Sequence, residues 1–298
     1  MDFKQLQFLC MLEQVRHFGD AAKRCHVTQP TLSMRVRALE DELDLPLVRR
    51  GHRFEGFTPE GERILHWARQ ITTAQTALKA EAAAFKGELY GQVRLGQVPF
   101  STIDLMPIIA DTHKRYPHLT FSLTTDRNRA LLDGLSDNTL DAVIVYDEGI
   151  VPQRHRFQRI HGSDFDILFD ADHFPALATL GTLPWTAIND WPVGLLTSSY
   201  RFRKSLDQML DGLGVVLEPL LEVDSLMAIV SAVRQGLCCA VIPSKFLEQR
   251  DLSGLMRIPM MRDESNANTL PDLGIAIKNQ SPLSPISKLM FELLGKKV

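Results

Sequence analysis

Apolar residues recur every seven positions along residues 59–88, and this repeat restricts the fold more than any other feature of the chain. Such spacing predicts a long helix whose apolar edge packs against another helix, as in a short coiled coil. A single helix lying on its own domain is the alternative. If the seam is real, the protein is at least a dimer. The repeat consists of Ile64, Ile71, Leu78 and Phe85, with Trp67 or Ala68, Ala74 and Ala82 between them.

Three shorter helices are predicted ahead of the long one. Residues 6–18 carry apolar side chains at helical spacing, and this helix should end near Gly19. Asp20 is expected to cap a second helix over residues 21–25, and Thr28 to cap a third. The third helix would bury one apolar stripe, formed by Leu32, Val36, Leu39 and Leu43.

Polar and basic groups gather at the start of the third helix, as in a helix-turn-helix that enters the major groove with that end first. Any small helical domain with a solvated face would show the same spacing. Residues 47–50 and 54–57, however, can pair as a hairpin with arginines near its tip, which is typical of a wing that contacts phosphates or the minor groove. The expected DNA contacts are Thr28, Gln29, Pro30, Thr31, Ser33, Arg35, Arg37, Arg50 and Arg53.

The string AAKRCHVTQPTLSMRVRALEDELDLPLVRR, from Ala21 to Arg50, followed by FTPEGERIL, from Phe57 to Leu65, resembles the signature of LysR-type transcriptional regulators. The resemblance is specific over these residues and weaker over the rest of the chain. Met34 stands where the family often has a polar residue, and Glu55-Gly56 occupy wing positions that are often basic. Contacts at those positions therefore do not follow from the resemblance.

The resemblance implies an organisation for the whole chain. Residues 1–58 would form a winged helix-turn-helix, residues 59–90 a linker helix that pairs with a second copy, and residues 91–298 an effector-binding domain. The implied partners are double-stranded promoter DNA, a small-molecule effector and further copies in a homodimer or homotetramer, with RNA polymerase as another candidate.

From Gly91 onward, strands alternate with helices, which predicts α/β lobes with parallel strands. The resemblance implies a two-lobed, periplasmic-binding-protein-like fold in which residues 270–278 and 286–294 return to complete the first lobe. Lobe I would comprise residues 91–162 and 268–298, and lobe II residues 163–267. The expected strands of the first lobe are 93–98, 119–125 and 140–146, with helices over 102–116 and 128–136, the latter capped by Asn128. The second set has strands near 164–169, 193–196, 220–223 and 237–242 and a helix over 225–235.

Strand-to-helix junctions of the two lobes should face each other across a cleft, where helix N-termini favour anions. A small anionic metabolite is therefore the expected ligand, although these hydroxyls would serve equally well as simple helix caps. The predicted ligand-binding residues are Phe100, Ser101, Thr102, Asn128, Thr197, Ser198, Ser199 and Ser225. Four nearby arginines could add positive charge for a carboxylate, but they are interpreted as solvated surface groups: Arg127, Arg129, Arg201 and Arg203.

Composition restricts the other function classes. With 298 residues the chain can form more than one domain, and no apolar run approaches the roughly 20 residues of a membrane span. The start does not look like a secretory signal, so we expect a cytoplasmic protein without a membrane partner, which disfavours a transport-type solute binder. The net charge is −3. DNA binding must therefore depend on where basic groups lie.

Motifs for catalysis are missing: we find no GxSxG, no HExxH, no P-loop and no GxGxxG after a strand. We therefore expect no enzyme activity, no cofactor and no metal. Cys238 and Cys239 would point to opposite faces of one strand, which is poor geometry for a disulfide, so redox sensing is disfavoured. The histidines of residues 91–298 are interpreted as solvated: His113, His118, His155, His161 and His173.

Overall fold

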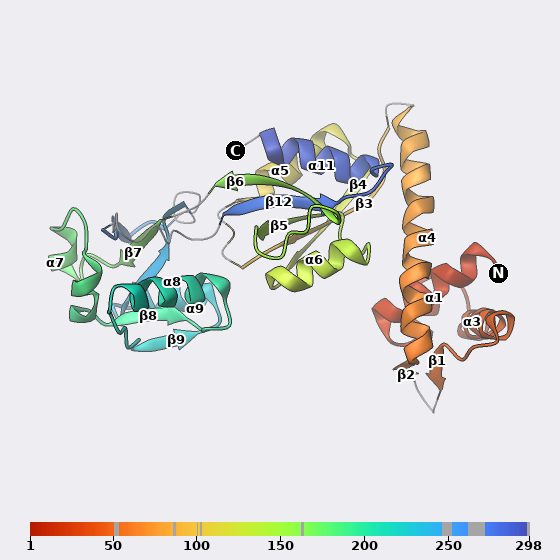
Figure 1. Cartoon of the computed structure of the whole chain (residues 1–298), viewed down its shortest axis with the longest axis horizontal. Helices are drawn as coiled ribbons and strands as arrows, with labels where there is room; N and C mark the ends of the chain where they lie inside the picture. Colours follow the sequence, from red (N-terminus) through yellow and green to blue (C-terminus); the bar gives the residue numbers. More distant parts are fainter. Residues whose placement is uncertain are drawn as a thin grey trace.

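Helices make up most of the first 84 residues, and two five-stranded sheets organise the rest (Figure 1). The computed structural model describes residues 1–50, 54–85, 88–99, 101, 103–161, 164–245, 252–261 and 272–296. Lobe I denotes here the sheet containing β3 (Gly91–Gln97) with its helices, and lobe II the sheet containing β7 (Phe165–Phe169) with its helices. In Figure 1, lobe I lies between the long helix α4 (Pro59–Ala84) and lobe II. Among the described residues, no helix has the length and apolar character needed to cross a membrane.

The first two helices start and end earlier than predicted. Helix α1 (Phe3–Val15) ends where Arg16 takes a left-handed conformation, so Gly19 does not terminate it. Helix α2 (Phe18–Arg24) is capped by His17, whose Nδ1 accepts the Asp20 N–H at 3.2 Å. The prediction that Asp20 caps this helix is wrong, because the imidazole supplies the cap one turn earlier.

The third helix and the wing are confirmed. Helix α3 (Gln29–Leu43) begins at Thr28, whose side chain accepts the Thr31 N–H, and its predicted stripe is buried at Leu32, Val36 and Leu39. Strands β1 (Val48–Arg50) and β2 (Phe54–Phe57) pair antiparallel. The tip of the hairpin, residues 51–53, lies outside the described residues.

Helix α4 (Pro59–Ala84) serves two parts of the molecule. Its first half packs on α1, with Leu65 and Ala68 buried in the core of the N-terminal domain. Ile64 also packs against that core, so it belongs to the domain rather than to a free seam. Further along, α4 contacts helix α11 of lobe I.

Lobe I contains a sheet with strand order β4-β3-β5-β12-β6. Strands β3, β4 and β5 are parallel, as predicted, and β12 pairs antiparallel with both β5 and β6. The expected return of the chain to this lobe is therefore confirmed, whereas β6 was not predicted. Its elements are β3 (Gly91–Gln97), α5 (Met106–Arg115), β4 (Leu119–Thr125), α6 (Asn128–Ser136), β5 (Ala142–Tyr146), β6 (His155–His161), β12 (Leu273–Lys278) and α11 (Pro285–Lys296).

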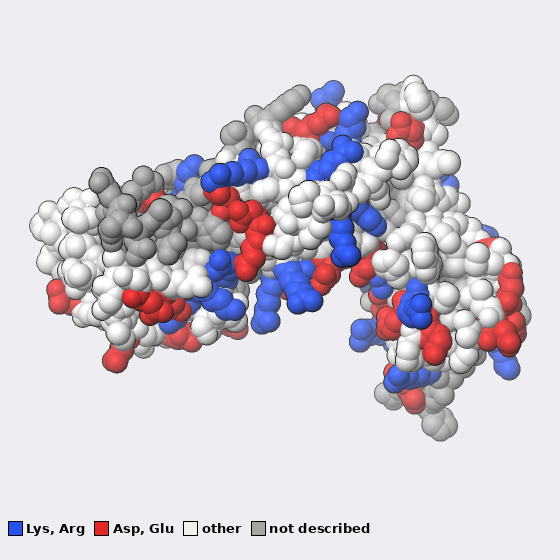
Figure 2. Space-filling view, in the orientation of Figure 1, with Lys and Arg blue, Asp and Glu red and all other residues white. Residues whose placement is uncertain are grey.

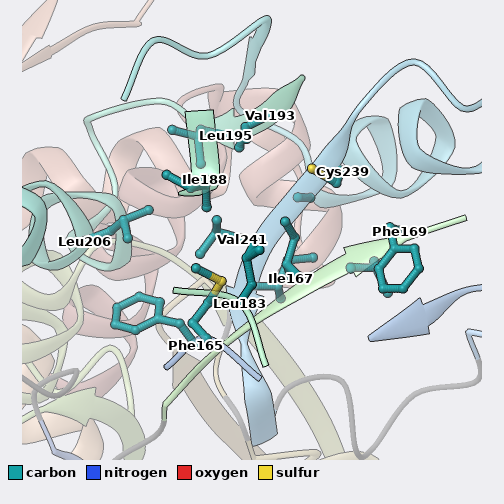
Figure 3. Close-up of a cluster of buried hydrophobic side chains, with 14 of the residues drawn as sticks. Phe165, Ile167, Phe169, Leu183, Ile188, Val193, Leu195, Leu206, Cys239 and Val241 are labelled. Atoms are coloured by element: carbon teal, nitrogen blue, oxygen red, sulfur yellow. The ribbon is translucent and has the colours of Figure 1, made fainter. Parts of the chain in front are cut away.

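Lobe II contains the second sheet, with strand order β11-β7-β10-β8-β9. Its core is built from side chains of β7, β8 and β10, including Phe165, Leu195 and Val241 (Figure 3). The elements are β7 (Phe165–Phe169), α7 (Pro175–Ala178), the 3-10 helix η1 (Trp185–Asp190), β8 (Val193–Leu196), α8 (Arg201–Gly212), β9 (Leu221–Val223), α9 (Leu226–Arg234), β10 (Cys239–Pro243) and β11 (Met256–Pro259).

Candidate functional site

The start of α3 presents side chains to solvent from a rigid helical base. Gln29 and Pro30 in its first turn are exposed, as is Arg37 two turns later, whereas Thr31 and Ser33 are half-buried. The hydroxyl of Thr28 lies 2.8 Å from that of Thr31, so these two groups are already engaged with each other. A long amide side chain at the tip of such a helix can reach base edges, and the start of α3 therefore has the geometry of a recognition helix.

Arg35 behaves differently from the other predicted contacts. Its guanidinium pairs with Asp2 at 2.5 Å, ahead of α1. The pKa of Asp2 is lowered chiefly by the hydrogen bond from the Gln5 N–H, and Arg35 lowers it further. Arg35 would thus have to release Asp2 to contact DNA, and a pair separated by 33 residues gives no local sequence signal. The side chain of Arg50 and the whole of Arg53 lie outside the described residues.

An apolar stripe runs along the outer edge of α4. Trp67, Ile71, Leu78 and Phe85 are 62, 42, 69 and 85% exposed, respectively. Ala74 and Ala82 lie exposed between them. Large apolar side chains in one row are unusual on a solvated surface and mark an interaction edge. This stripe contains three of the four residues of the predicted repeat.

A cavity of about 660 Å³ lies between the two lobes. Lobe I contributes residues from α6, from the end of β5 and from the start of β6, and lobe II contributes the start of α8. A second cavity of about 590 Å³ adjoins it, because both are lined by Val98, Pro99, Arg127, Ser199 and Tyr200.

Four of the predicted ligand residues line these cavities. Asn128 and Ser199 line the first, and Ser101, Ser199 and Ser225 line the second. Thr197 and Ser198 line neither, and the Thr197 hydroxyl instead lies 2.9 Å from that of Ser199. Phe100 and Thr102 lie outside the described residues.

Most of these polar groups are engaged in local hydrogen bonds. Ser101 exchanges hydrogen bonds with the backbone of Ile103, and Ser225 caps α9. Helix α5 starts at Met106, so the prediction that it starts at Thr102 is wrong. The carboxylate of Asp104, rather than a hydroxyl, accepts the Met106 N–H. The prediction that Asn128 caps α6 is wrong. Its side chain instead forms hydrogen bonds with the backbone of Tyr146 and Glu148 at the end of β5.

Cationic side chains line the first cavity on both lobes. These are Arg127, Arg129, Arg154, Arg201 and Lys204, against two acidic residues, Asp133 and Glu148. Figure 2 shows Lys and Arg side chains gathered between α6 and α8, where the lobes meet. Arg201 was interpreted as solvated, but its Nε lies 2.7 Å from a Glu148 oxygen across the cleft.

The other three arginines that were interpreted as solvated differ in their exposure to solvent. Arg127 and Arg129 are exposed although they line the cavity. Arg203 turns away from it and pairs with Asp207 at 2.7 Å and Glu222 at 2.9 Å. The local sequence cannot distinguish Arg201 from Arg203, because the difference depends on the side of α8 that faces lobe I.

His155 is the main site residue that the sequence did not indicate. It was interpreted as solvated, yet it is 6% exposed and lines the first cavity. It begins β6, which pairs it with Lys278 of β12. Because β12 lies more than a hundred residues later in the chain, the burial of His155 has no local signal.

All four cysteines carry raised thiol pKa values. Burial raises the pKa of Cys10 to about 11 and that of Cys239 to about 12, and it also raises those of Cys25 and Cys238. Thiols of this kind react slowly with oxidants, because the thiolate is the reactive form.

A winged helix-turn-helix, joined by a long helix to two lobes with a cavity between them, is the architecture of a ligand-controlled DNA-binding regulator. Comparisons with known proteins support this class. Residues 3–62 match the family described as bacterial regulatory helix-turn-helix protein, lysR family, and residues 86–298 match the LysR substrate binding domain. The chain belongs to the LysR family.

Three known proteins illustrate the similarity. The Escherichia coli K12 DNA-binding transcriptional dual regulator OxyR is 37% identical over 147 residues, 49% of this chain and 48% of that protein. The match thus spans about half the length of that relative. A full-length OxyR variant from Pseudomonas aeruginosa has a TM-score of 0.74 at 25% identity, covering 99% of this chain and 93% of that one. Full-length CbnR complexed with its target DNA has a TM-score of 0.69 at 18% identity, covering 99% of both chains. These relatives are regulators rather than enzymes, in agreement with the absence of catalytic motifs.

Proposed function

We propose that this protein regulates transcription by binding promoter DNA through α3 and the wing, under control of a small anionic molecule held between lobes I and II. The observation that carries the proposal is the exposed start of α3, within a segment that matches the helix-turn-helix of the family. Binding to chromosomal DNA would place the protein in the cytoplasm.

Different roles are proposed for the residues at the start of α3. Gln29 is suited to reading a base, because its amide can donate and accept at once. Thr28, Pro30, Thr31 and Ser33 position the helix, Arg37 and the wing arginines Arg50 and Arg53 contact flanking backbone, and Arg35 joins them once Asp2 is released. The exposed Met34 can contact a thymine methyl group.

The excess of cations in the first cavity supports an anionic effector. Arg201 and Lys204 come from lobe II, whereas Arg127 and Arg154 come from lobe I, so a ligand between them would contact both lobes. Only a ligand with different contacts in open and closed forms can shift the equilibrium between them.

Peroxide is the second candidate signal, because several relatives are named hydrogen peroxide-inducible genes activators. Thiol-based sensing needs an accessible cysteine with a lowered pKa. All four thiol pKa values are raised in this chain, and Cys238 and Cys239 lie buried. We therefore favour a bound metabolite over peroxide as the signal.

The exposed stripe on α4 supports a homodimer through a coiled coil between two copies, and the family resemblance supports a homotetramer made of two such dimers. A symmetric pair of recognition helices would bind two half-sites about one helical turn, or a multiple of it, apart.

A selection experiment tests the proposed function. Purified protein is mixed with sheared DNA from its own genome, and the bound fragments are sequenced. We expect a small set of enriched fragments, and Gln29→Ala should weaken their binding by about 1–3 kcal/mol while leaving random DNA nearly unaffected. Arg115→Ala, at the end of α5 in lobe I, is the matched control. Uniform recovery of all fragments by the wild type would refute sequence-specific binding.

A further inference from the structure

Two side-chain nitrogens of residues that line the first cavity are buried without a hydrogen bond among the described residues: Nε2 of His155 and Nε of Arg201. The Arg201 nitrogen is still paired electrostatically with Glu148, whereas that of His155 has no such partner among these residues. The Nε2 atom of His155 is inaccessible to water and finds no hydrogen-bond partner among the described residues. Leaving a buried donor unsatisfied is unfavourable, so such an atom at a cavity calls for an explanation. Because His155 lines the first cavity, a ligand that displaces the atoms covering this nitrogen can supply the missing partner.

The hydrogen bond of the other ring nitrogen, Nδ1, shows that the missing partner of Nε2 must be a hydrogen-bond acceptor. Nδ1 of His155 accepts the N–H of Val151 at 3.2 Å, so it carries no proton. The neutral ring therefore has its proton on Nε2, which can only donate. Burial, and then the neighbouring Arg154, lower the pKa of His155, which keeps the ring neutral at neutral pH.

A second neutral donor lines the same wall. Burial raises the pKa of Tyr146 to about 12, although Arg201 opposes this shift, so its hydroxyl keeps its proton. Beside its arginines, lobe I thus presents two uncharged donors, at the end of β5 and at the start of β6, and lobe II presents Arg201 and Lys204 at the start of α8. One ligand would have to match both the cations, which come from the two lobes, and the neutral donors of lobe I.

We propose that the effector is a carboxylate with a second oxygen acceptor, such as a keto or hydroxyl oxygen, that takes a hydrogen bond from Nε2–H of His155. The carboxylate replaces Glu148 as the partner of Arg201. His155 then selects hydroxy- and keto-acids over plain carboxylates. This inference rests on the proposed function, because it refines the ligand of the same cavity.

The protonation of His155 tests the first half of the proposal without any ligand. Two-bond proton–nitrogen NMR spectra of histidine-labelled protein distinguish a proton on Nε2 from one on Nδ1, and His155→Gln identifies the signal. We expect the neutral ring with its proton on Nε2. A proton on Nδ1, or a ring that is charged at neutral pH, would overturn the proposal.

Binding tests the second half. The probes are short-chain hydroxy- and keto-acids, each paired with its primary amide and with the plain carboxylate, screened by thermal shift and then by calorimetry. At least one hydroxy- or keto-acid should bind, and its amide and plain counterpart should each bind about tenfold more weakly. His155→Phe should lose about tenfold, whereas His155→Gln, which keeps an N–H donor, should recover most of that loss.

His118→Phe, an exposed position in lobe I, is the matched control and should bind as the wild type does. Circular dichroism of each variant checks the fold. Equal affinity of the acids for wild type and His155→Phe, or no binding of any acid in the set to the wild type, contradicts the proposal. DNA selection with the ligand-free protein is independent of these results, so failure here is distinguishable from failure of the proposed function.

Discussion

Gly61 shows how a single residue holds the wing against the linker helix. It lies in the first turn of α4, where a Cβ atom would come within 2.1 Å of the Leu47 carbonyl oxygen, ahead of β1. The Thr58 side chain, which accepts the Gly61 N–H, donates to the Pro46 carbonyl at 2.6 Å. The sequence F-T-P-E-G therefore encodes a close backbone contact between helix and wing.

Replacing Gly61 by alanine should destabilise the N-terminal domain. The new methyl group meets backbone, which cannot rotate away, and overpacking of this kind typically costs about 1–3 kcal/mol. Gly181→Ala is the control, since a Cβ there meets nothing within 4 Å. Chemical denaturation followed by far-UV circular dichroism gives both values. Equal stability of the two variants would show that the wing can shift to admit the methyl group.

The depressed pKa of His155 predicts a pH effect. A histidine whose pKa is lower in the folded than in the unfolded state binds protons preferentially when unfolded, so folding stability falls as the pH drops below the ordinary value of 6.5. The midpoint of thermal unfolding should therefore fall more steeply below that pH for the wild type than for His155→Gln. Parallel pH profiles for the two proteins would show that His155 does not contribute.

Single residues were predictable where their role is local. Thr28 was predicted to cap α3 because capping depends on the three residues that follow it. The Asp2–Arg35 pair, the His17 cap and the burial of His155 were not predicted. Two of these depend on residues far apart in the chain, and the third on an imidazole serving where aspartate is the commoner cap.

At the scale of elements, α6 connects the cavity to the DNA-binding half. Asn128, Leu132 and Ser136 of this helix line the cavity, and Asp137 follows directly after its last residue. The Asp137 carboxylate lies 3.0 Å from Nδ1 of His66 and 3.4 Å from Nη1 of Arg69, both on α4.

Arg69 extends this contact into the N-terminal domain. Its other terminal nitrogen lies 2.6 Å from a Glu13 oxygen on α1. One arginine thus joins α1, α4 and the end of α6, and a shift of α6 on ligand binding would reach both helices.

We expect Asp137→Asn to loosen the junction between α6 and α4. The variant keeps the side-chain shape but removes the charge shared by His66 and Arg69. Amide hydrogen exchange should become faster in the first half of α4 and at the end of α6, while lobe II stays unchanged. Asp211→Asn, at the end of α8, is the control. Unaltered exchange around Arg69 would mean that apolar packing, not this ion pair, holds the junction.

Most elements were predicted within a few residues because their apolar periodicity is local. Strand β4 and helix α6 have the predicted bounds, and β8 as well. Strands β6 and β11 were missed because polar and charged residues interrupt the apolar alternation in both of them.

At the scale of the whole molecule, the return of β12 and α11 to lobe I followed from the family resemblance and from no local pattern. The cavity between the lobes could be placed only roughly. Its lining depends on how α8 and α6 face each other, so three of the cations that line it, Arg127, Arg129 and Arg201, were first interpreted as solvated surface groups.

The exposed stripe on α4 predicts the assembly. Ile71→Glu combined with Leu78→Lys would place charges in the proposed seam, and each buried, unpaired charge should cost several kcal/mol. Analytical ultracentrifugation should then show a smaller species than the wild type. Lys79→Glu, which changes charge next to the stripe, should leave the oligomer intact. A double variant that sediments as the wild type would place the interface elsewhere.

The central claim is sequence-specific binding of DNA, and a ratio of two affinities tests it most directly. Fluorescence anisotropy can measure binding of the wild type to an enriched genomic fragment and to a scrambled fragment of equal length and composition, at physiological salt. We expect the enriched fragment to bind at least about 10³-fold more tightly, with an affinity that falls steeply as salt rises. A ratio near one, at any salt concentration, would contradict the account.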